Sequence, residues 1–211
     1  MKEINIIGVG SLGSYTAFEL GKMAPAFGWE FTYIDHDKVA PHNTINQLYR
    51  QADIGKYKVD ALSRIMWEFT GTRPRTRPVQ ANKDTSLHGT VIMLVDNMAA
   101  RKEIFEACAF RIDIDLYIEA RSGGTGAQVY ALDPRDTDLV KRYRETLYSD
   151  DESLPAPCAD ATTVPIIPLI AGTIGHILVR HDRQRIAQPE MLLVPIDLMD
   201  LPSLRTLRYN S

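Results

Sequence analysis

The chain has 211 residues, of which 45% are hydrophobic and 24% are charged. This composition is ordinary for a soluble globular protein and excludes disorder, collagen and coiled coil as descriptions of the whole chain. The net charge of −3, from 24 basic and 27 acidic residues, argues against a nucleic-acid partner held by clustered positive charge. The length is that of a single α/β domain spanning residues 1–211.

Apolar runs and helically spaced segments alternate along the chain. They predict strands over residues 4–9, 30–34, 79–81, 90–95, 116–120, 128–132 and 191–196, and helices over residues 14–23, 58–70, 99–110 and 164–180. Residues 73–78, with three arginines and two prolines, are expected to form a solvated loop, and residues 133–160 a polar interruption. The alternation predicts a Rossmann-like, doubly wound and mostly parallel sheet that turns antiparallel near its C-terminal end.

A glycine motif, Gly8-x-Gly10-x-x-Gly13, lies between the first predicted strand and the first predicted helix. Glycines there let the backbone approach a phosphate, and the helix N-terminus offers free N–H groups to an anion. Asp35 follows the second strand and is placed to bind ribose hydroxyls. This pattern is shared by dehydrogenases and ATP-binding proteins, and it also occurs as a turn that serves chain geometry alone.

Four motifs follow the glycine loop. They are Asp35-x-Asp37-x-Val39, Asn43-x-x-Asn46-Gln47, Gly55-x-x-Lys58-Val59, and Asp96-Asn97 followed by Arg101. Together they resemble the ThiF/HesA/MoeB family of adenylating enzymes, which includes ubiquitin-activating enzymes, over residues 4 to about 180. The family pattern is D-x-D-x-V, N-x-x-R-Q, G-x-x-K-V and D-N-x-x-x-R. The resemblance implies a ThiF/MoeB-type adenylation domain that binds ATP and Mg²⁺.

The resemblance also implies roles for individual residues. The nucleotide site would consist of Gly8, Gly10, Gly13, Asp35, Asp37, Asn43, Asn46, Gln47, Arg50 and Lys58. Lys58 would supply positive charge at the phosphates, and Asp96 would be the catalytic carboxylate that works with Mg²⁺. The implied reaction is attack on the α-phosphate by the C-terminal glycine carboxylate of a ubiquitin-like or sulfur-carrier protein. A homodimer or heterodimer, and an E2-like or sulfur-transfer partner, would fit the same family.

The sequence departs from the family pattern in three places. Asn46 stands where the family has a phosphate-binding arginine, and an amide cannot replace the charge or the fork of a guanidinium. We hypothesise that Arg50, one turn further on if this segment is helical, compensates. The first predicted strand begins at residue 4, so we expect no N-terminal extension carrying a further arginine. No CxxC pair is present, so we expect no zinc.

The two cysteines have different predicted environments. Cys158 lies in a proline-rich loop, where family members that form a thioester often carry a cysteine. A helix beginning near Thr162 would favour its thiolate, whereas Asp160 would oppose it. Cys158 is therefore a candidate catalytic residue, with an incidental loop thiol as the alternative. Cys108 lies on an apolar helix face and is expected in the core.

Several other interpretations stay open at this level. If the residues lack the roles that the resemblance implies, Lys58 would be a solvated lysine and Asp96 would be a helix N-cap. Arg101 would be a structural or surface residue. Asn43 and Gln47 would otherwise be turn residues. A non-catalytic nucleotide-binding subunit of a heterodimer is an alternative function, as is a nicotinamide dehydrogenase, for which the sequence offers no clear base. The scarcity of cysteines and the short N-terminal apolar run lead us to expect a cytoplasmic protein without membrane association.

Overall fold

The computed structural model describes residues 2–123, 126–148, 164–184 and 192–197. Its strands are β1 (Lys2–Ile7), β2 (Trp29–Ile34), β3 (Arg75–Arg77), β4 (Gly89–Met93), β5 (Ile114–Gly123), β6 (Gly126–Leu132) and β7 (Leu192–Asp197). Its helices are α1 (Ser11–Phe27), α2 (Lys58–Thr70), α3 (Met98–Cys108), α4 (Thr137–Arg144) and α5 (Ile166–Gln184), with 3₁₀ turns η1 (Pro41–Thr44) and η2 (Gln51–Asp53). None of the described helices combines the length and apolarity needed to cross a bilayer.

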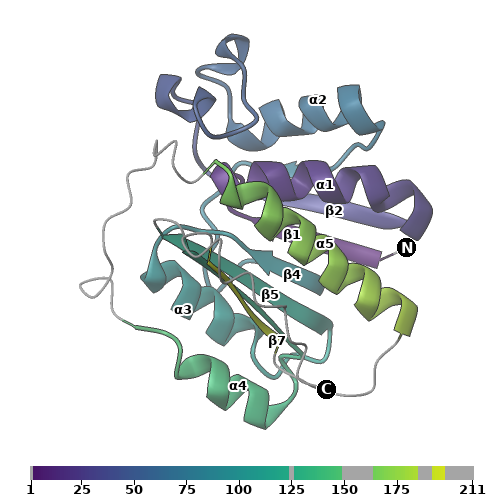
Figure 1. Cartoon of the computed structure of the whole chain (residues 1–211), viewed down its shortest axis with the longest axis vertical. Helices are drawn as coiled ribbons and strands as arrows, with labels where there is room; N and C mark the ends of the chain where they lie inside the picture. The colour runs from purple at the N-terminus through teal and green to yellow at the C-terminus, as the bar shows by residue number, and fades with distance from the viewer. Residues whose placement is uncertain (1, 124–125, 149–163, 185–191, 198–211) are drawn as a thin grey trace.

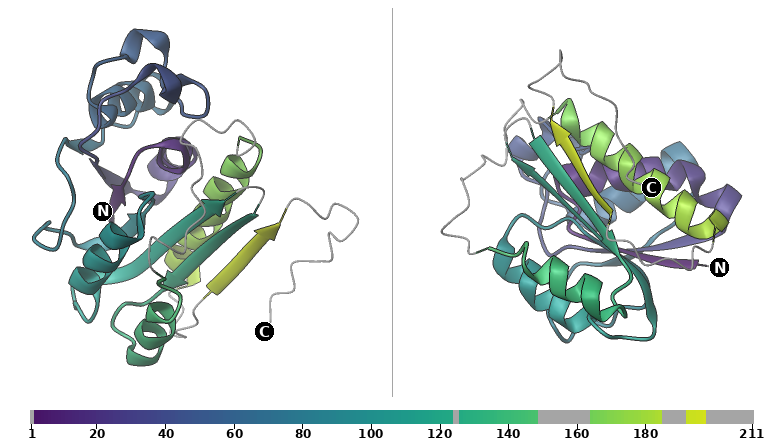
Figure 2. Two further views of the ribbon diagram at one scale, coloured as in Figure 1. Left: turned by 90° about the vertical axis from the view of Figure 1, so that its left-hand side faces the viewer. Right: turned by 60° about the horizontal axis from the view of Figure 1, so that its bottom comes forward.

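The strands of the described chain form one sheet in the order β3-β2-β1-β4-β5-β6-β7. The first five are parallel, whereas β6 and β7 run antiparallel to their neighbours. Helices α1, α2 and α5 cover one face and α3 and α4 the other (Figures 1 and 2), and each face has its own apolar core. The predicted Rossmann-like fold, including the antiparallel C-terminal strands, is confirmed.

The strand order reverses beside β1, which lies between β2 and β4. The chain leaves β1 toward β2 and β3, and then returns to the other side of β1 as β4. Open α/β sheets bind ligands at such a point, outside the carboxyl ends of the strands. The turns after β1, β2 and β4 therefore meet at one edge, and the backbone N–H of Leu94 donates to Ile7 O at 2.8 Å.

The edge strand β3 was wrongly located by the sequence. The predicted strand over residues 79–81 is not formed, and Arg75–Arg77, within the predicted loop, pairs with β2 instead. The prolines at positions 74 and 78 flank this strand, and edge strands tolerate proline and charged side chains because one side needs no ladder partner.

Helix α4 lies within the predicted polar interruption. Asp136 caps it by accepting from the backbone N–H groups of Asp138 and Leu139 at 2.9 and 3.0 Å. Its buried face consists of Leu139, Val140 and Tyr143. The helix has eight residues, and only three of them are buried, so its apolar signal is too short to stand out in the sequence.

The C-terminal end of α5 is tied to the N-terminal ends of β1 and β2. Lys2 Nζ lies 2.7 Å from Asp182 Oδ1 and 2.6 Å from His181 Nδ1, and the Trp29 indole N–H donates to Asp182. Burial raises the pKa of Asp182, but the hydrogen bonds from Lys2 and Trp29 outweigh it, so this pKa lies below its ordinary value.

This linkage predicts how stability depends on pH. A carboxyl with a lower pKa in the folded chain stabilises the fold above its unfolded-state pKa, and this contribution is lost as the pH falls through the folded-state pKa. Asp182→Asn should therefore lower the free energy of unfolding near neutral pH, and its difference from the unchanged protein should shrink below about pH 4. Urea unfolding over this pH range measures it, with Asp84→Asn at an exposed turn as the control. If the difference in free energy of unfolding between the two proteins stayed the same at every pH, the lowered pKa of Asp182 would be contradicted.

Candidate functional site: a nucleotide site at the switch point

The turn between β1 and α1 is built on close backbone approaches. Gly8 has φ +83°, and a Cβ there would lie 2.8 Å from Leu94 O in the turn after β4. A Cβ on Gly13 would lie 2.0 Å from Gly8 O, whereas a Cβ on Gly10 would meet nothing within 4 Å. Two of the three glycines are thus required by packing, and the third leaves open space at the helix start.

The N-terminus of α1 suits an anion. Gly10 is its N-cap and makes no side-chain capping bond, and the first turn contains no acidic residue. The free N–H groups and partial positive charge of this terminus remain available, and both favour a bound phosphate. Together with the open space at Gly10, these features fit the nucleotide that the glycine motif predicts.

Asp35 joins the end of β2 to the glycine turn. Its Oδ2 accepts from the Val9 N–H and its Oδ1 from the Asp37 N–H, both at 2.8 Å. Tyr49 donates its hydroxyl to Val9 O at 2.5 Å, and burial raises the pKa of Tyr49 well above its ordinary value. No sequence motif assigned a role to Tyr49. The half-buried Asp35 carboxylate keeps lone pairs for a further donor.

Lys58 is buried at the start of α2. Its side chain is 9% exposed and its Nζ lies 2.7 Å from Asp37 Oδ2, so it is not a solvated lysine. Burial raises the pKa of Asp37, but the hydrogen bond and charge of Lys58 outweigh it and leave that pKa below its ordinary value. A continuous chain of contacts therefore runs from Val9 through Asp35 and Asp37 to Lys58.

The polar segment after β2 packs against α1. Asn43 Oδ1 accepts from the Ala40 N–H at 2.8 Å, so its side chain shapes the turn. The Ser11 hydroxyl donates to Asn46 O at 2.9 Å. Asn46 and Gln47 are buried, and Gln47 Oε1 has no hydrogen-bond partner among the described residues. An orphaned buried acceptor of this kind beside the glycine turn is consistent with a ligand that supplies a donor.

Arg50 points toward α2. Its Nη2 donates to Glu68 Oε2 at 2.8 Å, its Nε lies 3.7 Å from Asp53 Oδ2, and its side chain is 49% exposed. Residues 45–50 form no helix, so Arg50 is not one helical turn beyond Asn46.

Asp96 lies in the turn after β4 and is exposed. It is not the helix N-cap: that position is Asn97, whose side chain accepts from the Ala100 N–H at 2.8 Å. Arg101, in contrast, is buried and structural. Within the described ranges, the only three-residue group placed to hold a metal ion is Asp35, His36 and Asp37, whose ligand atoms lie within 4.8 Å of one another.

The cysteines lie apart from this edge or outside the described residues. Cys108 is fully buried, and burial raises the pKa of its thiol to about 12, which confirms a core residue. Cys158 falls outside the described residues. The residue near Thr162 where a helix was expected to begin also falls outside them, and α5 starts at Ile166.

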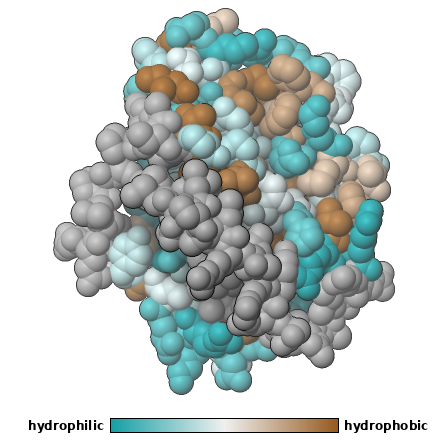
Figure 3. All heavy atoms as spheres, viewed as in Figure 1, coloured by the Kyte–Doolittle hydropathy of each residue, from teal (hydrophilic) through white to brown (hydrophobic). Residues whose placement is uncertain are grey.

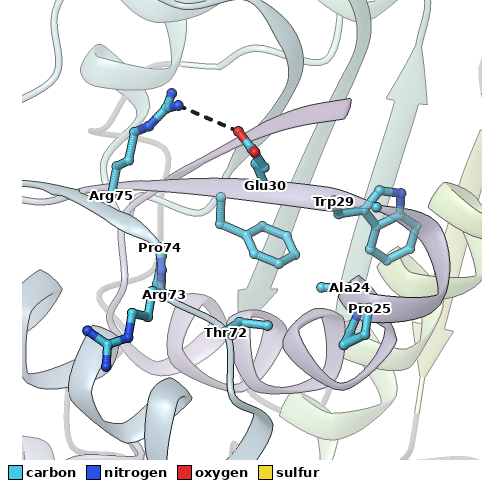
Figure 4. A pocket seen from close by; sticks show the side chains of 10 residues that line it. Ala24, Pro25, Trp29, Glu30, Thr72, Arg73, Pro74 and Arg75 are labelled. Atoms are coloured by element: carbon cyan, nitrogen blue, oxygen red, sulfur yellow. Dashed lines mark ion pairs between the residues drawn. The ribbon is translucent and has the colours of Figure 1, made fainter. Parts of the chain in front are cut away.

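A separate groove of about 390 Å³ lies at the opposite end of the sheet. Ala24, Pro25 and Trp29 form one side of it, and Arg73 and Arg75 the other (Figure 4). Figure 3 shows apolar surface mainly in the upper part of that view, where α1 and α2 lie. Trp67 and Phe69 are exposed aromatic residues of α2. Neither feature is part of the switch-point site.

The fold is a doubly wound α/β sheet with a glycine turn at its switch point, and a comparison with protein families identifies the family. The model of the ThiF family matches residues 2–191, so the chain belongs to the ThiF family. No curated protein matches it.

Solved structures share the fold at low identity. PaaA has a TM-score of 0.67 at 20% identity over 95% of this chain and 62% of its own. E. coli MccB with AMPCPP and MccA has a TM-score of 0.67 at 14% identity, over 93% of this chain and 63% of its own. E. coli MccB with ATP has a TM-score of 0.65 at 14% identity, over 93% of this chain and 64% of its own. The chain thus spans less than two thirds of the length of these proteins.

The glycine geometry predicts a contrast between two variants. Gly13→Ala forces a Cβ against Gly8 O and should cost at least about 2 kcal/mol of stability together with ATP binding. Gly10→Ala has room for its Cβ, so it should keep the unfolding midpoint but weaken ATP binding by filling the space at the start of α1. Thermal unfolding and calorimetric titration with ATP measure both effects. Unimpaired ATP binding by a folded Gly10→Ala protein would contradict this site.

Proposed function

We propose that the protein is an ATP-dependent adenylating enzyme, with residues 1–211 as a single adenylation domain. The observation that supports this most strongly is the chain of contacts from Val9 through Asp35 and Asp37 to Lys58, beside the uncapped N-terminus of α1. These contacts bring together, at one edge of the sheet, the groups to which we assign ribose and phosphate binding. Membership of the ThiF family and the presence of ATP in a related MccB structure support the same assignment.

The proposed acceptor is the C-terminal glycine of a small ubiquitin-like or sulfur-carrier protein. One oxygen of its carboxylate attacks the α-phosphorus of ATP, the bond from that phosphorus to the bridging oxygen breaks, and pyrophosphate leaves. The product is an acyl adenylate. Positioning and charge neutralisation carry most of the catalysis in such displacements, so the groups that matter are the free N–H groups of α1 and the ammonium of Lys58.

Within this proposal, Asn43, Asn46 and Gln47 line the phosphate side and Asp96 holds Mg²⁺. Mg²⁺ is commonly bound through one or two carboxylates plus substrate phosphates, which fits a single exposed Asp96. The ion would neutralise charge on the phosphates. Cys158 is the proposed acceptor for a subsequent thioester. A dimer, and an E2-like or sulfur-transfer partner, belong to the same proposal, as does a cytoplasmic setting.

The second candidate is a non-catalytic nucleotide-binding subunit of a heterodimeric activating enzyme. Asn46 favours it, because a buried amide stands where the family has an arginine. Such a protein would bind ATP through the same glycine turn and Lys58, but would not release pyrophosphate without its partner subunit.

ATP–pyrophosphate exchange, with and without candidate carrier proteins ending in glycine, separates these functions. The enzyme should exchange label only when the carrier is present. Lys58→Met removes a charge-assisted contact worth about 1.5–3 kcal/mol, so it should raise the Kd for ATP about 10- to 100-fold and reduce exchange accordingly. Lys56→Met, at an exposed lysine two residues earlier, is the matched control. ATP binding without exchange under every condition would favour the non-catalytic subunit, and unchanged binding by Lys58→Met would contradict the site.

If Arg50 compensates for the missing arginine, substitutions of Arg50 and of its ion-pair partner Glu68 should have different effects on ATP affinity. Surface pairs contribute only about 0–1 kcal/mol, so Arg50 can leave Glu68 at little cost when a triphosphate is bound. Arg50→Ala should weaken ATP binding, whereas Glu68→Ala frees the guanidinium and should preserve or strengthen it. Titration with ATP measures both. Equal, unchanged affinities would rule out a role for Arg50.

A further inference from the structure

A buried polar cluster lies beside the turn that carries Asp96. It consists of Arg101 on α3, Glu119 and Arg121 on β5, and Tyr143 on α4, and we call it the Glu119 cluster. Glu119 and Tyr143 are fully buried, and the side chains of Arg101 and Arg121 are only 8% and 9% exposed. Two guanidinium groups share one carboxylate, which leaves a surplus of one positive charge below the protein surface.

The carboxylate of Glu119 is saturated with donors. Arg121 binds it in a fork, with Nε 2.7 Å from Oε1 and Nη2 2.8 Å from Oε2. Arg101 donates to Oε1, and the Tyr143 hydroxyl donates to Oε2 at 2.6 Å. Removing one partner of such a buried set leaves an uncompensated charge, so its geometry is fixed as a unit.

The cluster holds three backbone segments at the carboxyl edge of the sheet. Arg101 donates to Val95 O in the turn after β4 and, at 3.2 Å, to Ala120 O within β5. Arg121 Nη1 donates to Thr146 O at 2.7 Å, beyond the end of α4. Arg101 and Arg121 thus tie the turn after β4 and the segment after α4 to strand β5.

Asp96 is held on both sides by this arrangement. The Arg101 guanidinium binds the carbonyl of Val95, the residue before Asp96. The backbone N–H of Arg101 donates to Asn97 O, and the Asn97 side chain caps α3. The Asp96 backbone is therefore fixed although its side chain is exposed and pairs with no described residue. A carboxylate that must meet a metal-bound triphosphate benefits from such prior fixing, because less order is lost on binding.

We propose that Arg101, through the Glu119 cluster, is the positioning residue that orients Asp96 toward the Mg²⁺ of the bound nucleotide. This inference rests on the proposed function, because it takes Asp96 as the metal-binding carboxylate. Arg101 and Glu119 do not contact the ion. They act on it through the backbone of residues 95–97, as outer partners do at metal sites generally.

The test is the Mg²⁺ dependence of ATP binding, measured by calorimetric titration of the full chain at increasing Mg²⁺. Arg101→Lys keeps the charge but has a single nitrogen, so it cannot bind Glu119 and Val95 O with separate nitrogens as Arg101 does. It should raise the Mg²⁺ concentration for half-maximal ATP binding by about tenfold. ATP binding without Mg²⁺ should stay unchanged. Tyr143→Phe removes one donor to Glu119 with little change of volume and should shift the Mg²⁺ dependence in the same direction, by less. Amide exchange of Asp96 and Asn97 should accelerate in both variants.

Two controls separate the outcomes. Arg144→Lys alters a bidentate pair between α4 and α3 that does not touch residues 95–97, and should leave the Mg²⁺ dependence unchanged. Asp96→Asn should shift it at least as far as Arg101→Lys. If Asp96→Asn shifts it but folded Arg101→Lys and Tyr143→Phe do not, the positioning role is wrong and the proposed function stands. If Asp96→Asn has no effect, both the metal role of Asp96 and the positioning role fail, while ATP binding through Lys58 is tested separately. If Arg101→Lys does not fold, Tyr143→Phe decides.

Discussion

The close approach of three backbones at the start of α1 is the constraint on which the site depends. Gly13 lies so near Gly8 O, and Gly8 so near Leu94 O, that no side chain fits at either position. These contacts bring the end of β1, the first turn of α1 and the turn after β4 into one rigid edge. Because these contacts need no ligand, the helix terminus to which we assign the phosphate is formed in advance, and binding there would cost little ordering of the chain.

Charge on this edge is arranged in two buried sets on either side of β1. On the β2 side, Lys58 is buried against Asp37, which is tied through Asp35 to the glycine turn. On the β5 side, Glu119 gathers Arg101 and Arg121 beneath the turn that carries Asp96. Both sets include positively charged side chains that are largely buried. Salt screens such buried charges less than it screens charges on the surface. In the proposed site, Lys58 would face the anionic ligand directly, whereas Arg101 would act only through the backbone of the turn that carries Asp96.

The sequence predicted the elements whose signal is local and strong. The glycine turn, helix α2 at Lys58–Thr70 and the apolar strand β4 were found because periodicity and turn chemistry are written in neighbouring residues. Strand β3 and helix α4 were missed, because a three-residue edge strand between prolines and an eight-residue helix depend on tertiary pairing. The same distinction between local and tertiary signals applies to the contacts of the site. Motif spacing pointed to Lys58. Its burial against Asp37, the contact of Arg50 with Glu68 and the contact of Arg101 with Glu119 each join residues 18 or more positions apart and carry no local pattern.

A crystal structure of the full chain with a non-hydrolysable ATP analogue and Mg²⁺ would show whether the nucleotide binds at this edge. We expect the triphosphate against Gly10 and the first turn of α1, the ribose hydroxyls on Asp35, and Lys58 Nζ moved from Asp37 to a phosphate oxygen. A nucleotide bound at any other place, or a triphosphate at this edge with Lys58 still paired to Asp37, would contradict the proposed site.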